Sequence, residues 1–201
     1  MKILVLLFFC LSLFGSEQYS FRVAYGKASK SDFGEIIFGD IQPHDEDLRV
    51  TGIDGGYLLK KNFFDMPLDI YLKGGLSYFD DSSVEGRNNL LETTIYLKAY
   101  WNFDFLNNRV RVGFGEGGSY TSSILYTEYQ EAEEKNDNNS NYLNYIDVSI
   151  DFDIGKLTTC KPLYGTYIGW ALKHRSGIFG LINNVRKGGS NYNTIFLERN
   201  F

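Results

Sequence analysis

The chain has 201 residues, which is the size of a single domain. It contains 15 Tyr, 16 Phe and 21 Gly but only 3 Pro, a mixture that suits pleated strands more than helices. Its formal charge is −5 and its Lys and Arg residues are scattered, so it lacks the basic stripe that a nucleic-acid-binding protein needs.

The N-terminal segment has the pattern of a secretory signal. Lys2 gives it a positive start, residues 3–14 form an apolar run too short to span a bilayer, and residues 15 and 16 are small enough for a peptidase to cut beside them. We expect residues 1–16 to be removed on export and residues 17–201 to form a single outer-membrane β-barrel domain. No later segment resembles a transmembrane helix, so a membrane-spanning mature chain has to be a barrel.

Two-residue alternation of apolar and polar side chains follows along nearly all of the remaining chain, and it predicts β-strands. In the first strand, Tyr19, Phe21 and Val23 alternate with Ser20 and Arg22. Eight strands are expected, each roughly as long as a tilted crossing of a bilayer requires. They cover residues 19–26, 48–60, 68–77, 91–104, 109–115, 145–154, 164–173 and 194–201.

One face of these strands is apolar and the other carries charges. Alternation alone is compatible with a membrane barrel, whose charges pair inside, and with a soluble sandwich or lipocalin-like barrel, whose charges meet water. The charged residues on the second face are Arg22, Asp69, Lys73, Glu92, Lys98, Asp104, Arg111, Asp147 and Asp151.

The lengths of the connections favour the membrane barrel. The odd-to-even connections are long and the even-to-odd connections are short, which is the asymmetry of outer-membrane barrels. The chain also ends on an aromatic residue, Phe201. This ending resembles the carboxy-terminal signal by which bacterial barrels are recognised for insertion into the outer membrane. We therefore predict an all-β, eight-stranded antiparallel transmembrane β-barrel in the bacterial outer membrane. The long connections are residues 27–47, 80–89, 118–140 and 176–190; the short ones are residues 62–66, 105–108 and 156–162.

Two histidines are present, and they differ in setting. His44 lies in a polar loop and is expected to be solvated. His174 lies at the long-loop end of the seventh strand, on the same face as Trp170 and as Ser176 two positions later. This is the lipid-facing set, where a polar pair is costly unless it has a use. A histidine so placed can take the proton of the serine hydroxyl and make the serine a nucleophile.

Such a pair needs a third group that holds the imidazole in one tautomer. Counting back from Phe201 places Asn191 on the same face and at the same end of the neighbouring strand. Ser190 points inward on this register, and Glu116 lies two strands away. These two residues remain alternatives to Asn191 as the orienting group.

The segment from His174 to the C-terminus resembles the PagL family of lipid A 3-O-deacylases, whose motif is a histidine followed two positions later by a serine and then by the last strand. The resemblance implies an eight-stranded barrel that hydrolyses an ester-linked acyl chain of lipid A on its outer wall. The chain departs from the family at two points. It has Ser190 and Asn191 where the family has a glutamate, and Gly177 where the type member has an asparagine.

The His174–Ser176 pair predicts a serine nucleophile, and the resemblance implies a serine esterase that deacylates lipid A in the outer leaflet. Ser176 is the expected nucleophile, His174 the base and Asn191 its orienting partner, while the Gly177 amide holds the oxyanion. The alternatives are a non-enzymatic barrel with a structural or adhesive role and an esterase acting on phospholipid.

The expected partners are lipid A, or lipopolysaccharide, and the outer membrane. Lys173 and Arg175 flank the histidine and are expected to attract lipid A phosphates. Neither a metal nor an organic cofactor is implied, because two isolated histidines and the single mature cysteine, Cys160, offer no ligand cluster. A monomer and a homodimer both remain open.

Overall fold

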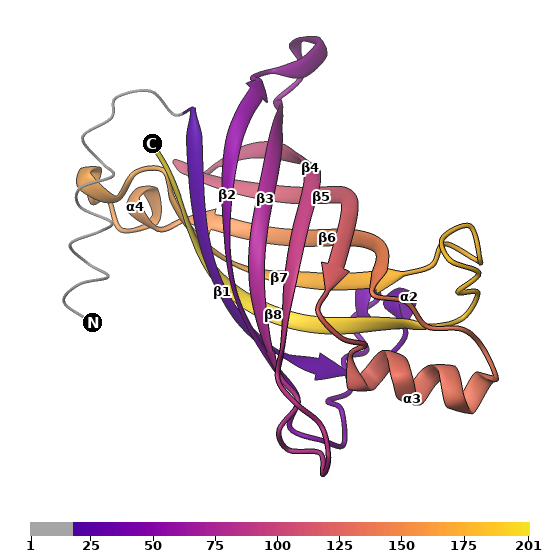
Figure 1. The fold of residues 1–201 in the computed structure, drawn as a ribbon. Coiled ribbons are helices and arrows are strands. Elements are labelled where there is room, and N and C mark those ends of the chain that lie inside the picture. The colour runs from indigo at the N-terminus through magenta and orange to yellow at the C-terminus, as the bar shows by residue number, and fades with distance from the viewer. Residues whose placement is uncertain (1–17) are drawn as a thin grey trace.

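In the computed structural model, residues 18–201 are described and form one closed barrel of eight antiparallel strands (Figure 1). Consecutive strands pair, and β1 pairs with β8 to close the sheet, so the predicted fold class is confirmed. The expected signal, residues 1–16, lies outside the described residues. The strands are β1 (Tyr19–Ser29), β2 (Arg49–Lys60), β3 (Leu68–Asp80), β4 (Leu90–Phe105), β5 (Asn108–Thr121), β6 (Tyr142–Asp153), β7 (Thr166–Ser176) and β8 (Gly189–Asn200).

The helices lie at both ends of the barrel. Figure 1 shows α2 (Phe33–Ile37) and α3 (Tyr126–Lys135) at the end with the long loops, and α4 (Ile154–Leu157) at the end with the C-terminus. The helices α2 and α3 thus lie within two of the long connections, residues 27–47 and 118–140. No helix among residues 18–201 is long and apolar enough to cross a membrane.

The short turns lie at the opposite end from α2 and α3, as the connection lengths predicted. The β4–β5 hairpin turns through Leu106 and Asn107, which both adopt positive φ angles of 47° and 61°, the backbone form that suits a two-residue hairpin. The other two turns contain short 3-10 helices, at Phe63–Asp65 and Lys161–Leu163. The last residue, Phe201, follows β8 and exchanges two 2.9 Å backbone hydrogen bonds with Tyr19, which ties the C-terminus into the barrel.

The outer wall is apolar and exposed. Its side chains alternate with inward residues along every strand, so the wall forms the belt that a lipid bilayer requires. Large exposed side chains of this belt include Ile53, Leu72, Leu76, Leu91, Ile95, Leu97, Val112, Phe114, Ile150, Phe152, Ile168 and Ile195.

The barrel interior is filled by paired charges. Arg22 donates to Asp54 and, at 2.7 Å, to Asp147, and Lys73 bonds Asp54 at 3.0 Å and also contacts Glu198. All of these side chains are buried, and mutual pairing offsets the cost of removing them from water. Eight strands thus enclose a packed ionic core and leave no wide channel.

One residue of the predicted inner set is not inside. Asp104 lies near the end of β4, where the strand extends past the barrel, and its side chain is 60 % exposed. It accepts two hydrogen bonds from Arg109 across the β4–β5 hairpin, at 2.9 and 2.7 Å. The alternation correctly places the Asp104 side chain on the inward-facing side of β4. The β4–β5 hairpin extends beyond the barrel, however, so this side chain is exposed to solvent.

Candidate active site

His174 and Asn191 meet on the outer wall near the long-loop end. They are Cα partners across the β7–β8 pair, and both belong to the outward face. The His174 Nδ1 atom lies 2.7 Å from the Asn191 Oδ1 atom, which is a hydrogen-bonding distance. The antiparallel register therefore brings together two residues that are 17 positions apart in the sequence.

A second hydrogen bond fixes the Asn191 amide, and this bond sets the tautomer of His174. The Asn191 Nδ2 group donates to the carbonyl oxygen of Ser31 at 3.0 Å, and a carbonyl can only accept. The Asn191 Oδ1 atom consequently faces the imidazole, so Nδ1 of His174 must carry a proton and donate it. The neutral ring then has its free lone pair on Nε2, the form that acts as a base.

Ser176 lies two residues after His174 on the same face and is the last residue of β7. Its Cα partners are Asn144 on β6 and Gly189 on β8. Among residues 18–201, no hydrogen bond joins the Ser176 hydroxyl to His174, although both side chains line one groove. Catalytic hydrogen bonds commonly tighten only when substrate binds, so this spacing is compatible with a nucleophile and its base.

This groove, which we call the β7 groove, has a volume of about 640 Å³ and runs along the outer wall. It places an apolar surface directly beside the polar pair, as an amphiphilic ligand would need. The apolar residues that line it include Phe33, Ile146, Ile178 and Phe179, and the polar ones include His174, Ser176, Asn191, Glu116, Arg186 and Lys187.

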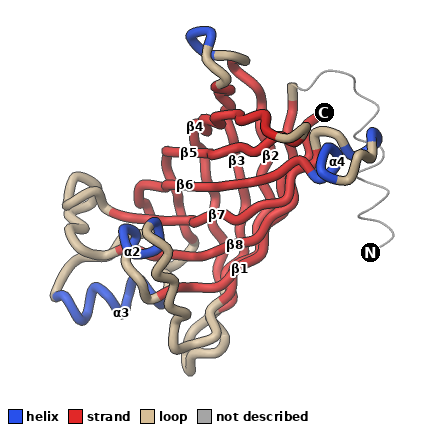
Figure 2. The backbone as a smooth tube through the Cα atoms, turned by 180° about the vertical axis from the view of Figure 1, so that it is seen from behind, coloured by secondary structure: helices blue, strands red, loops and turns tan. Residues whose placement is uncertain are grey.

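The first long loop folds back over the outer wall and covers part of this site. Figure 2 shows α2 in front of the ends of β7 and β8. The Phe33 ring lies with its centre 4.7 Å from the His174 ring. Leu172 faces outward but is fully buried, which shows that the wall is covered at this height. The imidazole is thus held between the Asn191 amide and an aromatic ring.

Gly177 occupies a position where no side chain fits. A Cβ atom there would lie 2.1 Å from the Val185 carbonyl oxygen, so the last long loop packs against bare backbone. The Gly177 carbonyl accepts the amide protons of Gly180 at 3.2 Å and Ile182 at 3.0 Å. These bonds hold the backbone beside Ser176 in one conformation.

The structure corrects the expectation for Lys173 and Arg175. Both side chains point into the barrel, because odd-numbered residues of β7 face inward. Lys173 pairs with Glu92 at 2.5 Å and Arg175 with Glu128 of α3 at 2.7 Å, and both cations are buried. They are therefore unavailable to phosphates outside the barrel.

The cations that line the β7 groove are instead Lys135, Arg186 and Lys187. The sequence pattern did not indicate Arg186 and Lys187, because they lie in an irregular loop without strand periodicity.

Neither alternative for the orienting residue brings its side chain to His174, although the Ser190 backbone hydrogen-bonds the imidazole. The Ser190 hydroxyl is buried and donates to Glu128 at 2.8 Å, inside the barrel mouth. Glu116 lies on the outer wall, but Ile146 of β6 is between it and His174. Asn191 is thus the residue that the structure brings to the imidazole. Among residues 18–201, no group of three or more His, Cys, Asp or Glu side chains could hold a metal ion.

The fold and the apolar belt define this chain as an eight-stranded barrel of the outer-membrane class. The solved structures that share its fold include the following two. The outer membrane enzyme PagL superposes with a TM-score of 0.58 at 12 % identity, over 90 % of this chain and 99 % of that one. Neisserial surface protein A (NspA) superposes with a TM-score of 0.52 at 12 % identity, over 92 % and 98 %.

No family model and no curated protein sequence matches the chain. The likeness is thus one of fold, and it agrees with the predicted location in the bacterial outer membrane.

Proposed function

We propose that this protein is a serine esterase that removes an ester-linked acyl chain from lipid A in the outer leaflet of the outer membrane. The observation that carries the proposal is the His174–Asn191 pair at 2.7 Å beside Ser176, on the outer wall of the barrel. Polar residues on a lipid-facing wall are costly without a function. The likeness in fold to the outer membrane enzyme PagL, and the resemblance of the C-terminal motif to that family, support it.

The proposed reaction begins with proton transfer from Ser176 Oγ to Nε2 of His174. The serine oxygen forms a bond to the ester carbonyl carbon, and the bond from that carbon to the sugar oxygen breaks. The imidazolium returns its proton to the leaving oxygen, which becomes a hydroxyl group. Water then attacks the acyl-enzyme by the same route and releases a fatty acid and free Ser176.

The neighbouring groups have supporting roles in this scheme. The Asn191 carbonyl keeps Nδ1 of His174 protonated, so that Nε2 is always the base. The Gly177 backbone amide is the proposed donor to the oxyanion of the tetrahedral intermediate. The apolar part of the β7 groove, lined by Phe33 and Ile146, accommodates the acyl chain.

The direct test is hydrolysis of purified lipid A by the detergent-solubilised protein, with the products identified by mass spectrometry. The wild type is expected to release one fatty acid, whereas Ser176→Ala and His174→Ala release none above background. Ser82→Ala removes an exposed hydroxyl that bonds Asp80, outside the β7 groove, and serves as the matched control. Equal hydrolysis by Ser176→Ala and the wild type would refute the proposed nucleophile.

A non-enzymatic surface barrel is the second candidate function. The likeness in fold to Neisserial surface protein A supports it, and so does the absence of a Ser176–His174 hydrogen bond among the described residues. In this case lipid A stays intact with every variant, and replacing His174 or Ser176 changes local stability alone. The long loops, rather than the β7 groove, would then carry the function.

A further inference from the structure

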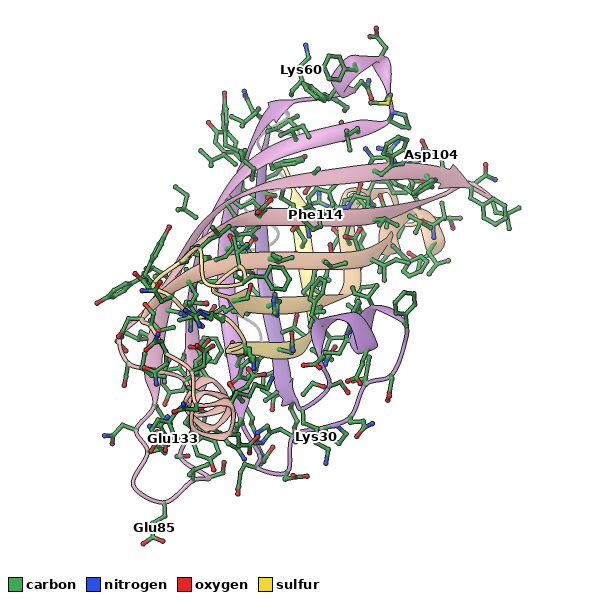
Figure 3. All side chains as sticks on the ribbon, turned by 90° about the vertical axis from the view of Figure 1, so that its right-hand side faces the viewer. Lys30, Lys60, Glu85, Asp104, Phe114 and Glu133 are labelled. Carbon is green, nitrogen blue, oxygen red and sulfur yellow. The ribbon has the colours of Figure 1, made fainter. Side chains whose placement is uncertain are left out.

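Glu116 places a carboxylate on the apolar outer wall. It lies on the outward face of β5, two residues after Phe114, which Figure 3 shows between the two ends of the barrel. Its Cα partners are Leu97 on β4 and Ile146 on β6, both apolar. Its side chain is exposed and, among residues 18–201, has neither a hydrogen bond nor an ion pair. An acid in this position is unfavourable unless a ligand or partner compensates it.

The position of Glu116 relative to His174 ties it to the esterase site. Ile146 is the Cα partner of both residues, so Glu116 and His174 lie in one row across β5, β6 and β7. Two strand spacings separate them by about 10 Å. Both side chains line the β7 groove, so a single headgroup can contact both.

Two cations complete the polar lining of the groove. Arg186 and Lys187 are exposed, and their backbone amides donate to Asp137 Oδ2 at 2.8 and 2.6 Å, which holds the loop in place. Neither side chain has an ion-pair partner among residues 18–201, whereas Lys135 of the same groove pairs with Glu131. The groove therefore offers two cations without an ion-pair partner, in addition to the Glu116 carboxylate.

We propose that Glu116 is a substrate-binding residue. Its carboxylate accepts a hydrogen bond from a hydroxyl or ammonium group of a lipid headgroup, while Arg186 and Lys187 bind the phosphate of the same headgroup. The ligand class is thus a phosphorylated amphiphile that also carries hydrogen-bond donors. The phosphorylated sugar of lipid A and the headgroup of phosphatidylethanolamine both have this chemistry. The assignment rests on the proposed function and names the recognition part of the same site.

The test measures binding without turnover. Ser176→Ala protein in detergent micelles is titrated with fluorescent lipid A, and then with fluorescent phosphatidylethanolamine. In this Ser176→Ala background, Glu116→Gln keeps the shape of the side chain and is expected to weaken lipid binding about tenfold. The double substitution Arg186→Ala and Lys187→Ala, made in the same background, is expected to have an effect of the same size. Glu85→Gln removes an acid at the tip of a loop (Figure 3) that does not line the β7 groove, and it is the matched control.

The two lipids distinguish the sources of the headgroup. Tighter binding of lipid A that falls with Glu116→Gln assigns the site to the sugar, and tighter binding of phosphatidylethanolamine that falls in the same way assigns it to a phospholipid. Unchanged affinity with Glu116→Gln, or no binding of either lipid, would overturn the proposal. Because nothing is hydrolysed in this assay, its failure is separate from a failure of the esterase, which is measured as product release.

Discussion

The orienting group of the proposed site is an amide, and this choice has a chemical consequence. Asn191 can hold the Nδ1–H tautomer of His174 through its 2.7 Å contact, but it carries no charge to stabilise an imidazolium. The Ser31 carbonyl prevents the amide from rotating. Asn191 therefore orients the imidazole without stabilising its charge.

Removing the Asn191 amide tests this arrangement. Asn191→Ala frees the imidazole to adopt either tautomer, and we expect kcat for lipid A hydrolysis to fall about 100-fold with little change in KM. Asn191→Asp adds a charge that stabilises the imidazolium but sets a carboxylate oxygen against the Ser31 carbonyl, so its kcat should lie between those of Asn191→Ala and the wild type. Asn193→Ala, one outward position along β8 where the side chain bonds Trp170, should leave kcat unchanged. A wild-type kcat for Asn191→Ala would contradict the role.

Gly177 supports a second prediction for a single residue. Gly177→Ala puts a Cβ against the Val185 carbonyl, so the last long loop has to move away from Ser176. Hydrolysis should drop at least tenfold while the barrel remains folded. Gly74→Ala, where a Cβ meets no atom closer than 3.7 Å, is the control and should behave like the wild type. Circular dichroism checks the fold of both variants.

At the level of elements, two helices from the long loops act on opposite sides of the wall. The α2 segment lies outside, where Phe33 contacts the His174 ring and Ile36 is buried. The α3 helix lies at the barrel mouth, where Glu128 accepts hydrogen bonds from Arg175 and Ser190. An outward-facing residue, His174, thus contacts α2, whereas the inward-facing residues Arg175 and Ser190 hold α3.

The contact of α2 with the imidazole is expected to influence catalysis. Phe33→Ala removes the ring next to His174, and an aromatic contact of this kind contributes about 0.5–1.5 kcal/mol. We expect hydrolysis to slow about threefold to tenfold. Phe38→Ala removes a ring that is 92 % exposed at the end of the same helix and should leave the rate unchanged. Equal effects from both variants would show that the ring contact is unimportant.

Docking of α3 is expected to depend on pH. Burial raises the pKa of Glu128 to about 7, because the nearby Arg175 compensates only part of the lost hydration. The folded protein then binds the Glu128 proton more tightly than the unfolded chain, so docking is strongest below about pH 4.5 and weakens as pH rises toward 7. Protection of the α3 amides from hydrogen exchange should fall across this range. Glu128→Gln should remove the trend; an unchanged trend would assign it elsewhere.

For the whole molecule, removing one partner from the ionic core is expected to be costly, because it leaves buried charges uncompensated. Asp147 contacts Arg22 and Lys98 and accepts a 3.1 Å hydrogen bond from Tyr145, all inside the barrel. Asp147→Ala leaves buried cations without a partner and should lower the free energy of unfolding by about 3–5 kcal/mol. Asp104→Ala breaks an exposed pair and should cost less than about 1 kcal/mol. Denaturant titration in detergent measures both, and equal losses would contradict the account.

Alternation along the chain was enough to predict the barrel and the face on which His174 and Asn191 lie, because strands have a fixed period of two. The same period of two places the side chains of Lys173 and Arg175 inside the barrel. Their position on either side of His174 in the sequence had suggested that they face phosphates outside it. The long loops have no such periodic pattern, so their structure could not be predicted in the same way. The α2 cover and the cations at residues 186–187 therefore depend on tertiary contacts that the sequence pattern does not contain.

The most direct test of the central claim is mass spectrometry of lipid A from cells that express this protein. Matched cells expressing Ser176→Ala, with both proteins confirmed in the outer membrane, provide the comparison. The account predicts that lipid A loses one acyl chain with the wild type and stays intact with Ser176→Ala. Intact lipid A in both, together with no hydrolysis by the detergent-solubilised protein, would contradict it and favour a barrel without enzymatic activity.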